Sequence, residues 1–226
     1  MKILLEDKDQ IVVHKPAGLA TQTARLGEKD LVSEIKNHIS KGQGDSNPYV
    51  AVINRLDQPV EGIVLFAKNA KAAAALTTQM QNGIMQKYYY AAVYGHMDNP
   101  KDELTDYLEK DSRSNCSRVV LKKTPAAKKA QLAYEVIVKG FGMDIVKIHL
   151  LTGRHHQIRV QFSSRKHPLI GDTKYGSEES IALGKEAGVR TPALCACCLV
   201  WEHPVSKKAL KVQIKPEHPL LNKIEE

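Results

Sequence analysis

Two short apolar runs, at positions 50–53 and 63–67, are separated by a polar loop that carries an arginine and an aspartate. Both runs are rich in β-branched residues and are bounded by proline or glycine, which is typical of buried strands. Loops at the ends of buried strands are where functional side chains commonly lie. We therefore expect Asp57 to be held at a strand end. An Arg55-x-Asp57 pair taken alone also fits an exposed surface ion pair.

Strand-like and helix-like patterns follow one another along the rest of the chain without an internal repeat. Glycines at 140 and 142 lie between two apolar runs, which predicts a β-hairpin. The hairpin strands are 133–139 and 144–151, and the other expected strands are 11–14, 88–94, 193–202 and 209–214. The expected helices are 30–39, 70–85 (interrupted or ended at 82–83) and 154–165. Residues 176–192 are expected to form a loop with one short helix. Strands with a few inserted helices predict an α+β domain with a mainly antiparallel sheet.

The expected helix at 154–165 combines an apolar face with a basic one. Ile158 and Phe162 are one helical turn apart, and His155 and Arg159 are one turn apart on an adjacent face. We expect the apolar face to pack against the sheet. The basic face is then expected to be free to meet an anion.

The composition favours a polyanionic partner. The 226 residues suffice for one domain with a sizeable core, and the formal net charge of +8 suits binding to phosphates. No apolar run approaches the ~20 residues that a membrane span requires, and the first residues do not form a signal peptide. We therefore expect a cytoplasmic protein whose cysteines are reduced.

Cys195, Cys197 and Cys198 form the one cluster that suggests a metal site. If they lie on a strand, the first two face one side and Cys198 faces the other, so the three thiols cannot converge on one ion. Buried small thiols explain the cluster better. The sequence also lacks a glycine-rich phosphate loop, and we expect neither a metal nor a nucleotide cofactor.

Five segments, in one order along the chain, resemble the RluA-type pseudouridine synthases. They are 13–18, 53–68, 87–95, 150–160 with 167–176, and 194–204. Several ordered blocks are far more specific than any single short motif. The resemblance implies the pseudouridine synthase fold, a mixed, mainly antiparallel sheet with packed helices and a central RNA cleft. Because the first block begins within the opening fifteen residues, we expect 1–226 to be a single catalytic domain without an accessory N-terminal RNA-binding domain.

The resemblance implies an RNA isomerase that acts on uridines of rRNA or tRNA. The bond between N1 and C1′ breaks, the uracil rotates while it is held, and C5 joins C1′. No redox change or group transfer occurs, so the reaction requires no cofactor. A carboxylate is expected to form a covalent intermediate with either C1′ or the pyrimidine ring, and the sequence leaves both open. We expect the enzyme to be a monomer.

The resemblance assigns the reaction to three residues. Asp57 matches the family's nucleophile, and Tyr89 in the 87–95 block matches the tyrosine that stacks on the uracil. Arg159 matches the active-site arginine, which is expected to pair with Asp57 and to favour its charged form.

Three further residues are expected to bind the substrate. Arg55 would hold a phosphate of the flipped nucleotide or of the flanking strand, Ile158 would lie beside the base, and Arg154 would contact RNA. Lys15 and Lys174 are expected to serve the phosphate track or the surface.

The chain departs from the family pattern beside the expected nucleophile. Asn54 stands where histidine is usual, and Val60-Glu61 replaces a Thr-Ser pair. A carboxylate at 61 would repel phosphate unless Glu61 pairs with a nearby basic side chain. These departures favour one alternative, a catalytically silent RNA-binding relative. A second alternative is an unrelated hydrolase that uses Asp57 with His155 or His156, although the chain lacks a nucleophile elbow.

Overall fold

The computed structural model describes residues 1–23, 27–43, 47–121 and 124–224. These residues form two compact units. Unit 1 comprises Met1–Gln86 and Ala196–Pro216, and unit 2 comprises Lys87–Cys195 and Glu217–Glu226. No helix in the described ranges is long and apolar enough to cross a membrane.

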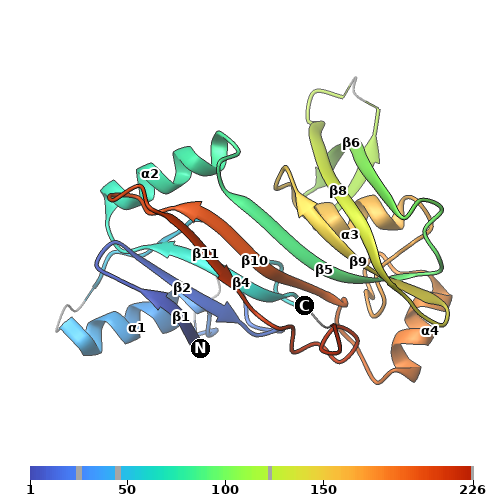
Figure 1. The fold of residues 1–226 in the computed structure, drawn as a ribbon, viewed down its shortest axis with the longest axis horizontal. Helices are drawn as coiled ribbons and strands as arrows, with labels where there is room; N and C mark the ends of the chain where they lie inside the picture. Colours follow the sequence, from blue (N-terminus) through green and yellow to red (C-terminus); the bar gives the residue numbers. More distant parts are fainter. Residues whose placement is uncertain (24–26, 44–46, 122–123, 225–226) are drawn as a thin grey trace. The chain divides into compact units, whose positions relative to one another are not determined.

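Unit 1 is a sheet with two helices (Figure 1). Its strands are β1 (Lys2–Glu6), β2 (Gln10–Lys15), β3 (Ala51–Val52), β4 (Glu61–Ala67), β10 (Leu194–Glu202) and β11 (Ala209–Gln213). The order is β1-β2-β4-β10, with β3 also paired to β4 and β11 to β10. Every residue of β2 and β4 is buried. The burial explains the apolar runs at 11–13 and 63–67, and it also covers the polar residues of β2, Gln10, His14 and Lys15.

The two helices of unit 1 begin at the caps that their sequences supply. α1 (Leu31–Gln43) follows Asp30, whose Oδ1 accepts a hydrogen bond from Ser33 N at 2.7 Å. α2 (Ala70–Gln81) follows Asn69, whose side chain accepts one from Ala72 N at 2.8 Å. Such caps satisfy backbone donors that the first turn leaves unpaired.

Gly62 allows β4 to approach β10 closely. A Cβ at this position would lie 2.5 Å from Ala196 N, and the backbone φ is +137°. Only glycine fits both the contact and the conformation. This glycine lies five residues after Asp57 and fixes how the chain leaves the Asp57 loop.

Unit 2 contains an antiparallel sheet in the order β5-β9-β8-β6-β7. The strands are β5 (Gln86–Tyr94), β6 (Lys101–Asp111), β7 (Cys116–Val120), β8 (Lys128–Lys139) and β9 (Met143–Leu150), and the helices are α3 (Gln157–Ser163) and α4 (Glu178–Glu186). The glycine connection between β8 and β9 forms the predicted hairpin, with Gly142 at φ +70°.

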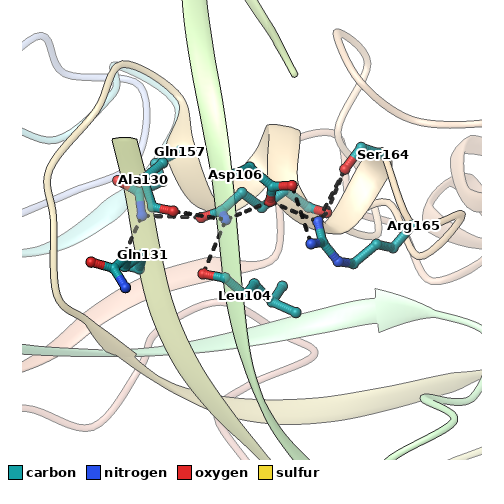
Figure 2. Close-up of polar contacts among 8 residues, drawn as sticks. Leu104, Asp106, Ala130, Gln131, Gln157, Ser164 and Arg165 are labelled. Atoms are coloured by element: carbon teal, nitrogen blue, oxygen red, sulfur yellow. Dashed lines mark hydrogen bonds and ion pairs between the residues drawn. The ribbon is translucent and has the colours of Figure 1, made fainter. Parts of the chain in front are cut away.

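Helix α3 is held on the sheet by a buried glutamine pair. Gln157 Nε2 donates to Gln131 O and to Gln161 Oε1, and Gln161 Nε2 donates to Asp106 Oδ2 at 2.7 Å. Figure 2 shows this network and its continuation to Arg165, which donates to both carboxylate oxygens of Asp106. The amides replace apolar contacts with directed bonds, so α3 is fixed in both position and rotation.

The predicted fold class, α+β with a mainly antiparallel sheet, is confirmed, and so are all the predicted strands. The prediction for α3 was wrong in two respects. The helix begins at Gln157, so Arg154 and His155 precede it, and residues 157–162 are all buried. The helix therefore presents no free basic face among its described residues. β1, β6 and β7 were not predicted.

Candidate active site

The backbone of the loop that carries Asp57 is held by hydrogen bonds to another segment of unit 1. Thr21 Oγ1 donates to Leu56 O at 3.0 Å and accepts from Leu56 N at 3.3 Å. Gly18 N donates to Gln58 O at 2.8 Å. Because both residues beside Asp57 are fixed, the carboxylate is carried on a rigid loop, and its side chain is half-buried.

Lys15 lies beneath this loop, so its predicted place on the phosphate track or surface was wrong. It is fully buried, and its Nζ donates to the carbonyl oxygens of Pro16, Leu19 and Gln58 at 3.0, 2.7 and 3.0 Å. Burial lowers the pKa of the Lys15 ammonium to about 8, against the opposing effect of the Asp57 and Glu61 carboxylates. Lys15 thus places a buried cation near Asp57.

The structure accommodates the two departures beside Asp57. Asn54 is buried, where its Nδ2 donates to Ile63 O at 3.0 Å and its Oδ1 accepts from Leu65 N at 2.8 Å, so it ties the loop to β4. Glu61 is also buried and lies 3.7 Å from His14 Nε2. The expectation that Glu61 has a basic neighbour is confirmed. Arg55 is exposed.

Tyr89 lies on the face of the unit 2 sheet that α3 covers. Tyr89 pairs with Ile148, and Ile148 pairs with Tyr134, so the three side chains share one face. The Tyr134 ring packs edge-on against Phe162 of α3 at 5.6 Å. The alternation along β5 therefore gives Tyr88 to the opposite face, where its ring stacks on His149 at 4.7 Å.

Arg159 is buried on α3 and fixed by Asp172. Its Nε donates to Asp172 Oδ2 and its Nη2 donates to Asp172 Oδ1, both at 2.7 Å. Asp172 is fully buried, and its Oδ1 also accepts from the backbone N atoms of Lys174 and Tyr175. A parallel two-bond pair fixes the plane of the guanidinium as well as its position.

Tyr175 covers the guanidinium of Arg159. The distance from Arg159 Cζ to the centre of the ring is 5.1 Å, and burial raises the pKa of the Tyr175 hydroxyl to about 12. That hydroxyl accepts from Ser117 N at 2.7 Å and lies 2.7 Å from His156 Nδ1. Sequence reasoning missed Asp172 and Tyr175. The only available signal was their place in the 167–176 block.

The remaining predicted residues of unit 2 flank Arg159. Ile158 precedes it on α3 and is buried. Arg154 is exposed, and its Nε donates to Lys129 O at 2.8 Å. His155 stacks on His156 at 3.7 Å and lies 2.9 Å from Ser117 Oγ, so both histidines have neighbours within unit 2. Lys174 is exposed and donates to Asn115 O.

A hollow of about 620 Å³ lies at the unit 2 sheet, and none of the predicted site residues lines it. Its lining comprises Tyr88, Lys101, Asp102, Glu103, Ala133, Tyr134, Glu135, Lys147 and His149. The lining carries three carboxylates and two lysines, and Lys101 pairs with Glu135 at 2.8 Å, so it offers no excess of positive charge to a phosphate backbone. We therefore assign the candidate site to the face that carries Tyr89 and α3.

One cluster in unit 1 has the side chains of a metal site. Asp7, Asp9 and His203 bring potential ligand atoms within 4.8 Å of one another. His203 Nδ1 accepts from the N atoms of Val205 and Ser206, so Nε2 is the nitrogen that donates to Asp7 Oδ2 at 3.2 Å. Hydrogen bonding therefore accounts for the arrangement of Asp7 and His203 without an ion.

The family pattern described as RNA pseudouridylate synthase matches residues 9–164. The chain belongs to the RNA pseudouridylate synthase family. The predicted RluA-type resemblance is also confirmed, because the dual-specificity RNA pseudouridine synthase RluA of Vibrio vulnificus is 30% identical over 217 residues, covering 91% of this chain and 79% of that protein.

Two further relatives of this RNA pseudouridylate synthase family member are longer than the chain. An uncharacterized RNA pseudouridine synthase of Mycoplasma genitalium is 34% identical over 191 residues, covering 82% of the chain and 59% of that protein. Ribosomal large subunit pseudouridine synthase D of Nitrosomonas europaea is 32% identical over 213 residues, covering 93% of the chain and 60% of that protein. The chain thus spans about three fifths of the length of these relatives.

A solved structure confirms the pseudouridine synthase fold. The human RNA pseudouridylate synthase domain containing 4 matches with a TM-score of 0.79 at 20% identity, covering 98% of this chain and 91% of that one.

Proposed function

We propose that this chain is an RNA pseudouridine synthase that isomerises specific uridines of rRNA or tRNA with Asp57 as the nucleophile. The observation that carries the proposal is the fixed guanidinium of Arg159, which a buried carboxylate orients through two 2.7 Å bonds. A protein that only bound RNA would have no need to orient one buried arginine so closely. Both units would then act as one catalytic domain, and a monomer would suffice.

In this proposal, Asp57 is the nucleophile and Arg159 is the active-site arginine. Asp172 binds Nε and Nη2 of the Arg159 guanidinium and so fixes its plane. Tyr89 would stack on the uracil while it rotates, and Ile158 would exclude water beside the base. Arg55 and Arg154 would hold flanking phosphates, because both side chains are exposed. RNA substrates of these classes would place the protein in the cytoplasm.

The silent RNA-binding relative is the second candidate, and Glu61 was the observation in its favour. That carboxylate is buried beside His14 in unit 1 and near the charge of Lys15. The nearby Lys15 ammonium offsets the negative charge of Glu61. The departure at 61 therefore favours a silent relative less than the sequence alone suggests.

Isomerisation can be measured without knowing the target site. Ribosomal and transfer RNA transcribed with uridine tritiated at C5 release tritium when C5 joins C1′. We expect release with the wild type and none with Asp57→Asn, whereas RNA affinity should stay within a few fold. The matched control is Asp98→Asn, an exposed aspartate of unit 2, which should retain full turnover. Turnover in purified Asp57→Asn would refute the nucleophile, and a wild type that binds RNA but releases no tritium would support the silent relative.

A further inference from the structure

Lys87 is a buried lysine that the proposed mechanism does not use. It lies on β5 two residues before Tyr89, so both side chains belong to the same face of the sheet. Lys87 is 9% exposed. Among the described residues its side chain forms no hydrogen bond and no ion pair.

The loop between β9 and α3 passes directly over the ammonium group. A Cβ placed on Gly153 would lie 3.7 Å from Lys87 Nζ. Gly153 has no side chain, so its backbone is accessible to a small ligand at this point. The next residue is Arg154, whose guanidinium is oriented by the bond from its Nε to Lys129 O.

The charges around Lys87 are positive. Burial lowers the pKa of Lys87, and the charge of Arg154 lowers it further. The pKa of His149 is lowered by its own burial and then by the charge of Lys87. A buried cation beside a second cation destabilises the protein unless an anion compensates them. Lys87 is therefore costly in the free protein and becomes favourable when a negative group binds.

We propose that Lys87, Arg154 and the Gly153 backbone form a binding site for one phosphate group of the RNA strand, next to the nucleotide that stacks on Tyr89. The site rests on the proposed function only in that the phosphate belongs to the RNA substrate. An ammonium supplies a compact charge, and a guanidinium supplies a planar fork of donors, so together they suit a phosphodiester. Two residues of strand separate Lys87 from Tyr89 by roughly 6.6 Å, which places the phosphate close to the stacked base.

The site makes a prediction that a structural lysine does not. Lys87→Met removes an uncompensated cation, so the Tm of the free protein should stay the same or rise. Affinity for a fluorescein-labelled 20-nucleotide oligouridylate should fall about tenfold, and the slope of log affinity against log salt should become shallower by about 0.7, the value for one phosphate contact on a single strand. Lys139→Met, at an exposed lysine of the same unit, should change neither the affinity nor the salt slope, and it should leave Tm unchanged.

Inorganic phosphate distinguishes the source of the ligand. If phosphate raises the Tm of the wild type but not of Lys87→Met, while the two proteins bind oligouridylate equally, the site serves the free ion and the RNA assignment is wrong. A large fall in Tm for both Lys87→Met and Lys87→Gln with unchanged RNA affinity and salt slope would show that the lysine is structural, and would overturn the proposal.

The binding assay is independent of turnover. Weaker binding and a shallower salt slope in Lys87→Met support the site even if no tritium is released, in which case only the proposed activity fails. Tritium release with no effect of Lys87→Met on binding leaves the proposed activity standing and overturns the site.

Discussion

Asp172→Asn tests whether the orientation of Arg159 matters for the reaction. The native carboxylate is fully buried and accepts four hydrogen bonds, two from the guanidinium and two from the backbone N atoms of Lys174 and Tyr175. An asparagine oxygen in the place of Oδ1 can still accept from the backbone and from Nη2, but the NH₂ group then takes the place of Oδ2 and faces the Nε donor of Arg159. The substitution therefore leaves a buried guanidinium without its countercharge in unit 2.

Breaking a buried ion pair in this way costs about 3–5 kcal/mol. For a chain of this length each kcal/mol lowers Tm by about 2–4 °C, so the expected fall is roughly 6–20 °C. Urea unfolding followed by circular dichroism measures the free energy directly. At 20 °C, where the variant stays folded, kcat for tritium release should fall about 100-fold, because small misplacements of a catalytic group have effects of that size.

The chain supplies a matched control for this pair. Asp106 also receives two bonds from one arginine, Arg165, which is carried at the end of the same helix (Figure 2). The Arg165 side chain is 32% exposed, whereas that of Arg159 is 6% exposed. The asparagine oxygen of Asp106→Asn can still accept from Gln161, which helps to position α3. Asp106→Asn should therefore cost less than the about 3–5 kcal/mol expected for Asp172→Asn, and kcat should fall by much less than about 100-fold. Equal losses of stability from the two substitutions, or normal turnover in Asp172→Asn, would refute the reasoning.

Two other predictions concern Lys15 and Tyr89. The Lys15 pKa of about 8 in the folded state is below its unfolded value of about 10.4, so between these pH values the unfolded state binds more protons. The free energy of unfolding should therefore rise with pH over this range, by at most about 3 kcal/mol. Urea unfolding at pH 7.5 and pH 10 should show a smaller rise in Lys15→Met than in the wild type, and identical rises would contradict the assignment. Tyr89→Leu should weaken transition-state binding by about 1–3 kcal/mol through lost stacking, measured as kcat/KM, whereas Tyr88→Leu on the opposite face should change kcat/KM by no more than a few fold. If the two leucine variants lost activity equally, the register of β5 would not explain the choice of tyrosine.

The elements predicted from the sequence are those that depend on local chemistry. Apolar runs bounded by glycine and proline predicted β2, β4, β9 and β10, and the Asp30 cap predicted the start of α1. β6 and β7 were missed because charged and polar side chains fill many of their positions. Neither strand therefore shows the apolar alternation that reveals a strand in a sequence. The ordered family blocks identified the family and the predicted site residues without help from the fold.

Tertiary structure decided what surrounds the charged residues. A sequence does not distinguish a buried lysine from an exposed one, because burial depends on segments that are distant in sequence. The carbonyl oxygen of Gln58 reaches Lys15 in this way, and the charge of Arg154 reaches Lys87. Helix α3 begins at Gln157 because the Gln157 side chain accepts from Arg154 N at 3.0 Å and bonds to Gln131 across the sheet. Asp172 is thirteen residues from Arg159 in sequence, and only the fold brings its carboxylate against the guanidinium. The packing of the chain after α3, rather than the local sequence, decides where the Asp172 side chain points.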